Sequence, residues 1–286
     1  MKLAIAIASA DAPASAFVVW RGFENSIRKA SEYGYHGVEL ALKTAKDVDP
    51  DKLNRLLETH KMEVSCISTG QVFALLGIYF THPNTAVRRQ AVKVFEGLIL
   101  LAKDFGKIIN IGRTRGGVAD GQPRQEAERL FVETAEQVCA IAQRHGVTIL
   151  IEPVNRYEIN FVNNLDEGAA LLKKLACQNV GLMPDVFHMN IEDANIRESL
   201  VRHAGLIRYI HLADSNRLAP GQGHLDFDEV FEALKEAQFK GWASIEILPS
   251  PDPDTAAAAA ANSILPLIKK YNACLVQKAE TREATT

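Results

Sequence analysis

The sequence contains few of the residues that crosslink a chain, and no run that would cross a membrane. Only four of its 286 residues are cysteines (Cys66, Cys139, Cys177 and Cys274), and no two of them form a CxxC pair. A chain of this length buries a sufficient core without disulfides, so we expect four buried thiols in a reducing cytoplasm. Because no apolar stretch approaches the roughly 20 residues of a membrane-spanning helix, we expect a soluble protein with no membrane partner.

A strong excess of charge of either sign is also missing. Lysine and arginine number 32 against 35 aspartates and glutamates, which gives a net charge of −3 at pH 7. This balance offers no general attraction to a polyanion, so we expect no nucleic-acid partner. No proline- or serine-rich linker divides the chain, which predicts a single domain.

The N-terminus carries a short apolar run, residues 3–9, that has two interpretations. It is at the short end for the hydrophobic region of a signal peptide, and it also fits a first strand. We favour the strand, because the segments that follow alternate between strand and helix patterns. No GxGxxG motif follows this run, which argues against the alternative of a doubly wound sheet with a dinucleotide site.

Apolar strands and amphipathic helices alternate along the whole chain. Eight predicted strands, each followed by a helical segment, are typical of a (β/α)8 TIM barrel, whose active site lies at the C-terminal ends of the strands. We therefore expect an α/β TIM barrel over residues 1–271 and a flexible tail over 272–286. The expected strands are 3–8, 37–40, 63–68, 107–112, 148–151, 180–185, 207–211 and 242–246, and the expected helices are 23–34, 49–60, 86–105, 123–145, one from Asn164, 195–204, 226–238 and one ending near Tyr271.

One connection, residues 68–86, is long and unusually apolar. It contains Phe73, Leu76, Tyr79 and Phe80. Loops of this length in a compact domain are commonly functional. Because of these aromatic residues, we expect a lid or a subunit contact and not a disordered connector.

Four of the predicted strands end in a residue that binds metals or transfers protons. Residues 148–151 are followed by Glu152, and the next three strands end at Asp185, His211 and Glu246. Because consecutive strands are neighbours in a barrel, we expect these side chains to converge. Three carboxylates so close together repel one another unless a cation lies among them. Oxygen ligands with one imidazole suit Mn²⁺, with Mg²⁺ or Co²⁺ as alternatives, and the lack of thiolates argues against a structural zinc.

Two of these acids, Glu152 and Glu246, are expected on opposite sides of the metal. A metal stabilises the negative charge that forms beside a ketone when the adjacent carbon loses a proton. Inversion of that carbon needs a proton removed from one face and returned to the other. The two glutamates are therefore candidates for the acid and the base.

The residues around these positions resemble one family of enzymes. The stretches IEPVNRYE (151–158), PDVFHMN (184–190), IHLADSNR (210–217) and SIEIL (244–248) are similar to the sugar isomerase/epimerase family with a xylose-isomerase-like TIM barrel. The similarity is greatest to ketose 3-epimerases of the D-tagatose 3-epimerase type, and it extends to about residue 271. It implies C3 epimerisation of a ketose through a cis-enediolate. The implied Mn²⁺ ligands are Glu152, Asp185, His211 and Glu246, with Glu152 and Glu246 as acid and base.

The same resemblance implies residues that contact the substrate. Glu158, His188 and Arg217 would contact its hydroxyl and carbonyl oxygens, and the assembly would be a homodimer or a homotetramer. The alternatives are that His188 packs under a loop and that Arg217 is a solvated loop charge.

The sequence departs from the best-known sugar epimerases of this family after His211. Where those continue with a serine and a glutamate, this chain has residues 213–216, Ala-Asp-Ser-Asn, before Arg217. The substrate can therefore be a keto sugar acid, such as 5-keto-gluconate, or another ketose. Arg113 and Arg115 follow the fourth predicted strand and could pair a substrate carboxylate or phosphate. We favour the alternative that they are surface charges.

Other functions of such a barrel remain open. A hydroxypyruvate-type isomerase and an inosose-type dehydratase share the metal set and also begin from an enediolate. A sugar-binding barrel without activity would have lost its acid and base, and here Glu152 and Glu246 are both present. An endonuclease IV-like site would need more histidines at the ends of strands two to four, and a Schiff-base aldolase would need a lysine at a strand's C-terminal end.

Overall fold

The structure, a computed structural model, describes residues 1–13 and 16–283 of the chain. In this part, eight parallel strands form a path in the order β7-β6-β5-β4-β3-β1-β9-β8, and a short β2 pairs with β1 beside it. Isolated bridges from Leu182 to Ile207 and from Asp185 to His211 join the two ends of this path, so the ring is nearly closed. The strands are β1 (Lys2–Ala8), β2 (Trp20–Arg21), β3 (Gly37–Ala41), β4 (Glu63–Ser68), β5 (Ile108–Ile111), β6 (Thr148–Ile151), β7 (Val180–Leu182), β8 (Tyr209–Leu212) and β9 (Trp242–Ile245).

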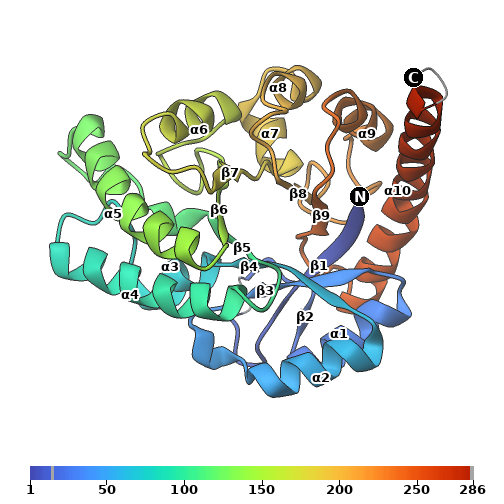
Figure 1. Cartoon of the computed structure of the whole chain (residues 1–286), viewed down its shortest axis with the longest axis horizontal. Coiled ribbons are helices and arrows are strands. Elements are labelled where there is room, and N and C mark those ends of the chain that lie inside the picture. Colours follow the sequence, from blue (N-terminus) through green and yellow to red (C-terminus); the bar gives the residue numbers. More distant parts are fainter. Residues whose placement is uncertain (14–15, 284–286) are drawn as a thin grey trace.

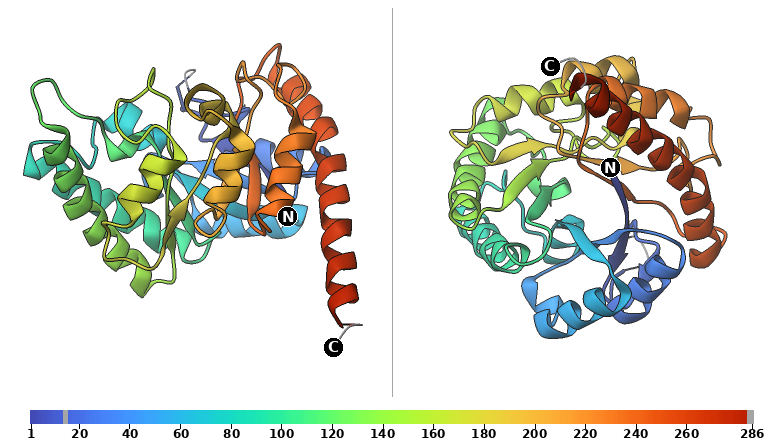
Figure 2. Two further views of the ribbon diagram at one scale, coloured as in Figure 1. Left: turned by 90° about the horizontal axis from the view of Figure 1, so that it is seen from above. Right: turned by 45° about the vertical axis from the view of Figure 1, so that its right-hand side comes forward.

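Helices form an outer ring around these strands (Figure 1; Figure 2). The predicted single-domain TIM barrel is therefore confirmed. Two helices begin where capping residues were expected: Asp49 accepts the backbone N–H of Lys52 at 3.0 Å, and Asn164 accepts that of Glu167 at 2.9 Å. The helices are α1 (Phe23–Glu32), α2 (Pro50–His60), α3 (Gly70–Leu76), α4 (Thr85–Ala102), α5 (Arg124–Arg144), α6 (Leu165–Leu172), α7 (Val186–Glu192), α8 (Ile196–Arg202), α9 (Phe227–Glu236) and α10 (Pro253–Glu283), with short 3₁₀ turns η1 (Ala45–Asp47) and η2 (Arg113–Arg115).

The strands are buried on both faces, as their continuous apolar runs predict. In β6, Ile149 and Ile151 pack into the core cluster that includes Phe131 of α5. The residue between them, Leu150, belongs to a separate cluster with Tyr209 and two other buried side chains. Successive strand residues point to opposite faces, so Leu150 lies inside the barrel. The apolar run ends where the strand reaches the mouth of the barrel, and polar side chains begin there.

Residues 68–86 differ from the predicted loop. They contain the helix α3, and Phe80 is fully buried, with its ring centroid 4.9 Å from that of Phe95. A role for Phe80 in a lid or a subunit contact is therefore wrong, because this ring fills the core under α4 and α5. Leu75 and Leu76 remain exposed, at 44% and 38%. The lid and the predicted homodimer or homotetramer stay predictions.

The C-terminal part also differs from the prediction. The last helix, expected to end near Tyr271, runs to Glu283 and extends beyond one end of the barrel (Figure 2). The flexibility of 272–286 stays a prediction, and residues 284–286 lie outside the described part of the chain. Two of the four thiols, Cys177 and Cys274, are only half-buried, so the expectation of four buried thiols is wrong for these. None of the described helices is long and apolar enough to cross a membrane.

Candidate metal centre and active site

Four side chains that the sequence predicts to converge do so at the mouth of the barrel. Glu152 follows β6, Asp185 follows β7, His211 lies in β8 and Glu246 follows β9. One potential ligand atom from each lies within 4.8 Å of the other three. Asp185 and His211 are fully buried and Glu152 is nearly so. Three carboxylates so close, with an imidazole among them, form a donor set that can hold a divalent cation.

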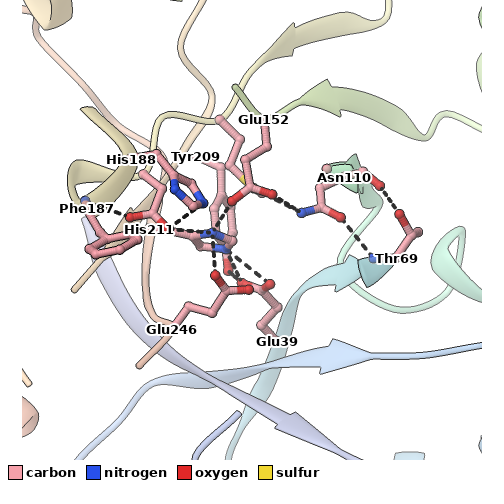
Figure 3. Close-up of polar contacts among 12 residues, drawn as sticks. Glu39, Thr69, Asn110, Glu152, Phe187, His188, Tyr209, His211 and Glu246 are labelled. Carbon is pink, nitrogen blue, oxygen red and sulfur yellow. Dashed lines mark hydrogen bonds and ion pairs between the residues drawn. The ribbon is translucent and has the colours of Figure 1, made fainter. Parts of the chain in front are cut away.

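His211 lies at the centre of this cluster, between Glu152 and Glu39 (Figure 3). Its Nε2 is 3.0 and 3.1 Å from the two carboxylate oxygens of Glu39, and its Nδ1 is 2.9 Å from Oε1 of Glu152. Burial opposes a charge on the ring, but the negative charges of Glu39, Glu246 and Glu152 outweigh it and raise the pKa of His211 well above its usual value. In the metal-free protein both ring nitrogens therefore donate, Nε2–H to Glu39 and Nδ1–H to Glu152. A bound cation would displace the proton on Nδ1, while Glu39 would keep the Nε2–H and hold the ring in this orientation.

Glu39 was missed by the sequence-based prediction. It lies within β3, is fully buried, and accepts a hydrogen bond from the hydroxyl of Tyr209 at 2.9 Å. Burial alone would raise its pKa, but the nearby charge of His211 and these hydrogen bonds lower it, so Glu39 stays ionised. A lone acid inside the apolar run of residues 37–41 was the available signal, because a buried charge needs a partner.

Glu152 is held from its other side by Asn110, which was also missed. The side-chain amide of Asn110 donates to Oε2 of Glu152 at 3.1 Å, and its Oδ1 accepts the backbone N–H of Thr69 at 2.9 Å. The contact with Thr69 sets the orientation of the amide. A Cβ on Gly112 would lie 2.6 Å from Oε2 of Glu152, so only glycine leaves room for this carboxylate.

Arg217 is a buried part of the site and not a solvated loop charge. Its side chain donates to Oδ2 of Asp185 and to Oε2 of Glu246. The guanidinium lies 4.8 Å from the ring centroids of both Phe17 and Phe187, within the range of a cation–π contact. The backbone of Arg217 has a left-handed φ of 64°, which the surrounding loop must hold in place.

That loop is organised by Asp214, which belongs to the segment 213–216 where the sequence departs from the family pattern. Its carboxylate accepts backbone N–H groups of Ser215 and Gly221, each at 2.7 Å, and of Leu225 at 3.1 Å. These bonds fold the segment that carries Arg217. Asp214 therefore supports Arg217 through the backbone of the loop.

His188 is buried, and its protonation is set by Asn155. Oδ1 of Asn155 accepts the backbone N–H of Tyr157 at 3.0 Å, so its amide nitrogen must be the group that lies 2.8 Å from Nδ1 of His188. Nδ1 is therefore an acceptor, and Nε2 carries the proton. Burial lowers the pKa of His188 to about 3, so the ring is neutral. The same amide donates to Oε1 of Glu158 at 3.2 Å.

The two arginines after β5 have different surroundings, and neither is simply a surface charge. Arg115 is fully buried, and its guanidinium donates to the backbone carbonyls of Gly112, Glu152, Phe161 and Val162. It therefore supports the loops and is not available to a substrate. Arg113 is partly exposed and lies in the wall of the active-site cavity.

That cavity contains the groups predicted to contact the substrate. Its lining includes Phe17, Gln71, Arg113, Glu152, Glu158, His188, Arg217 and Glu246. A larger groove lies between α1 and α2 and contains none of the predicted site residues. The predicted metal ligands and substrate contacts thus lie in or beside one cavity at the C-terminal ends of the strands.

These features define a TIM barrel with a candidate divalent-metal site at its mouth. The chain belongs to the xylose isomerase-like TIM barrel family, whose model matches residues 27–267. This finding confirms the resemblance that the sequence motifs indicated.

Three comparisons illustrate the relationship. The chain is 28% identical to the L-ribulose 3-epimerase of Mesorhizobium japonicum over 226 residues, which cover 78% of this chain and 74% of that protein. It is 27% identical to the ketose 3-epimerase of Arthrobacter globiformis over 228 residues, which cover 77% and 75% of the two chains. The crystal structure of the D-allulose 3-epimerase from Methylomonas sp. in complex with D-allulose aligns with a TM-score of 0.79 at 24% identity, over 95% of this chain and 97% of that one. Epimerases are isomerases, which agrees with the enzyme class predicted from the sequence.

Proposed function

We propose that this protein inverts C3 of a ketose or a keto sugar acid, with a divalent cation held by Glu152, Asp185, His211 and Glu246. The donor set favours Mn²⁺, with Mg²⁺ and Co²⁺ as alternatives. The observation that carries this proposal is the convergence of these four groups within 4.8 Å beside one cavity. The 3-epimerases among the relatives support the type of reaction.

The bound cation would supply positive charge beside the ketone oxygen as negative charge develops there. Glu152 and Glu246 would carry out the proton transfers. They come from β6 and β9 and both line the cavity, so one carboxylate removes the C3 proton and the other protonates the opposite face. This transfer through an enediolate changes no other bond and needs no further reactant.

Three side chains would hold the substrate oxygens. Nδ1 of neutral His188 accepts from Asn155, so Nε2 carries the proton. Among the described residues this Nε2–H forms no hydrogen bond, since the nearest carboxylate oxygen, Oδ2 of Asp185, is 3.8 Å away. Arg217 carries the positive charge nearest to Asp185 and Glu246, and Glu158 can accept a hydrogen bond from a hydroxyl. These groups hold the ketose while C3 becomes planar.

Proton NMR in D₂O tests the proposed reaction directly. The Mn²⁺-loaded protein is incubated with ketoses, keto sugar acids and hydroxypyruvate, the paramagnetic ion is removed, and the position of deuterium is determined. We expect deuterium at C3 together with the C3 epimer. Activity should disappear after treatment with a chelator and return with added Mn²⁺.

Other outcomes would identify the alternative functions. Deuterium at C1 or C2 with an aldehyde product would indicate a hydroxypyruvate-type or other sugar isomerase, and loss of water would indicate an inosose-type dehydratase. Binding without any exchange would indicate a sugar-binding barrel. Full activity after chelation would contradict the metal site.

The affinity for the metal is expected to decrease as the pH is lowered below about 8. Burial raises the pKa of the Glu246 carboxyl to about 8, with a further contribution from Glu152 and against the opposing charges of His211 and Arg217. The metal-free protein therefore holds a proton on Glu246 below this pH, and a cation must displace it. Displacement of this one proton should raise the Mn²⁺ dissociation constant, measured by calorimetry, at least about eightfold from pH 7.5 to pH 6.5.

The folding stability of the metal-free protein changes with pH in the opposite direction to its metal affinity. From 4.5, the ordinary pKa of glutamate, to about 8, the folded metal-free chain holds a proton that the unfolded chain has lost. Glu246 therefore lowers the stability of the metal-free protein as pH rises through this window. The variant Glu246→Gln should lack this contribution. Equal Mn²⁺ affinity at both pH values in the unmodified protein would contradict the assignment of Glu246 as a ligand.

Arg217→Ala is expected to lower kcat/KM by more than tenfold, about 1.4 kcal/mol of transition-state stabilisation. The substitution removes the guanidinium that pairs with Asp185 and Glu246, from a residue that lines the cavity. The measurement is steady-state epimerisation of the substrate found by NMR. Arg197→Ala is the control, because Arg197 pairs with Glu236 on the outside of the barrel. A value within twofold of the unmodified enzyme would exclude this role for Arg217.

A further inference from the structure

Arg113 lies where a side chain could bind substrate, and the proposed reaction assigns it no role. It begins η2, directly after β5, and its side chain is 29% exposed in the wall of the cavity that contains Glu152 and Glu246. Its guanidinium lies 5.9 Å from the ring centroid of Phe73 on α3, which supports it from one side. The side chain is therefore part of the cavity wall and not a free surface group.

The donors of this guanidinium are available. The nearest acid is Glu158, and the distance from Nη1 of Arg113 to Oε2 of Glu158 is 3.8 Å, which is too long for a hydrogen bond. Within residues 1–13 and 16–283, no side-chain hydrogen bond of Arg113 is formed. Arg115, two residues later, donates to four backbone carbonyls. The same short turn thus holds one arginine that is fully used and one whose donors face the cavity.

The place of Arg113 in the barrel indicates which part of a substrate it would meet. In the ring, β5 and β9 are separated by three strands in either direction, so Arg113 and Glu246 leave opposite sides of the mouth. The reacting carbon of the ketose would lie between Glu246 and Glu152, and Glu152 follows β6, the neighbour of β5. A sugar chain that continues past Glu152 can therefore reach Arg113. A planar group of N–H donors there matches a carboxylate or a phosphate. Glu158 beside it can accept the hydrogen of an adjacent hydroxyl.

We propose that Arg113 binds one negatively charged group, a carboxylate or a phosphate, on the part of the ketose chain remote from the reacting carbon. This inference rests on the proposed function and names its substrate class: a keto sugar acid or a ketose phosphate. The recognition is electrostatic and geometric, so a lysine at this position would retain the charge and lose the paired donors.

Three sugars with one carbon skeleton test the proposal. D-Tagatose, D-tagaturonate and D-tagatose 6-phosphate differ in the group at C6: an alcohol, a carboxylate or a phosphate. We expect kcat/KM of the Mn²⁺-loaded enzyme to be at least tenfold higher for one of the two anions than for D-tagatose, and the preferred anion identifies the source of the charge. Arg113→Gln should lower kcat/KM for that anion at least tenfold and change it for D-tagatose less than threefold, and Arg113→Lys should restore part of the loss.

Arg156→Gln is the matched control, because Arg156 is a neighbouring exposed arginine that pairs with Glu192 outside this cavity. It should change none of the three values by more than twofold. An unmodified enzyme that prefers D-tagatose to both anions, or an Arg113→Gln variant that loses activity equally on all three sugars, would overturn the proposal.

A binding measurement separates this proposal from the proposed reaction. D-Galactonate and galactitol carry no ketone and differ only in a carboxylate, so calorimetry with them does not depend on turnover. We expect D-galactonate to bind at least tenfold more tightly than galactitol, and Arg113→Gln to remove the difference. If no ketose reacts but this difference is found, the proposed reaction fails and the anion site stands. Equal binding of the two compounds to the unmodified protein overturns the anion site.

Discussion

Replacing Glu246 by glutamine is expected to lower kcat by at least about a thousandfold while the barrel stays folded. General acid–base catalysis alone contributes about 10²- to 10⁴-fold. The substitution removes a carboxylate that, in the proposed reaction, also binds the cation. Glutamine keeps the shape of the side chain and can still accept a hydrogen bond from Arg217, so packing around β9 should be preserved. The measurement is epimerisation under saturating substrate and Mn²⁺, with circular dichroism as the test of folding.

The control for this experiment is the same chemical change at the other end of the barrel. Glu63 begins β4, is exposed, and pairs with Lys2 on the surface. Glu63→Gln should leave kcat within twofold, because exposed ion pairs contribute little. A folded Glu246→Gln variant with kcat near that of the unmodified enzyme would exclude the two-carboxylate mechanism. Loss of deuterium exchange at C3 in the variant would place the defect at the proton-transfer step.

Replacing Glu39 by alanine is expected to weaken Mn²⁺ binding 10- to 100-fold and to lower the free energy of unfolding of the metal-free protein by about 3–5 kcal/mol. Glu39 accepts the Nε2–H of His211 and the hydroxyl of Tyr209 while fully buried. Without it, the imidazole loses the group that directs Nδ1 to the metal position, and a buried charge loses its partner. Calorimetry with Mn²⁺ and urea unfolding at pH 7.5 measure the two effects.

Two further variants separate the position of His211 from the stability of the core. Glu39→Gln can still accept the hydrogen bond from His211 but lacks the charge, so its Mn²⁺ affinity should lie between those of the alanine variant and the unmodified protein. Tyr209→Phe removes one hydrogen bond to Glu39 and leaves His211 in contact with the carboxylate. Its Mn²⁺ affinity should change less than threefold. Unchanged Mn²⁺ affinity in Glu39→Ala would show that Glu39 does not position the ligand.

The order of strands and helices could be predicted because each depends on local periodicity and capping. The apolar run at 148–151 is a strand because it is buried on both faces, and helix α2 starts at Pro50 because Asp49 caps it. The short helices α3 and α7 were missed. Each has only seven residues and follows a strand directly, so its apolar residues were attributed to a loop or to the strand. The last helix was expected to end near Tyr271 because the tail from residue 277 onward is polar, although alanine, leucine, glutamine, lysine and glutamate, which occur after Tyr271, are good helix formers.

The site could be predicted where a chemical group ends a strand. Glu152, Asp185, His211 and Glu246 stand at successive strand ends, and the barrel brings successive strand ends together. The surroundings of Arg113 and Arg115 could not be predicted in this way. The two residues share one turn, yet one guanidinium binds backbone carbonyls of residues 161 and 162 and the other faces the cavity. That difference depends on contacts with segments nearly fifty residues away.

The sequence by itself determined the barrel, its four candidate metal ligands and its two candidate proton carriers, because these follow from patterns within short segments and from the regular order of strands in a barrel. Only the tertiary structure decided that Glu39 holds His211, that Asn155 sets the proton on His188, and that Arg217 pairs with Asp185 and Glu246. Asp185 and Glu246, which pair with Arg217, stand at the ends of strands and could be recognised there. Glu39 and Asn155 do not, so no strand-end pattern in the sequence marks their roles. Their roles arise because a buried charge or imidazole must find a partner of the right shape nearby, and which residue is nearby is a property of the folded chain.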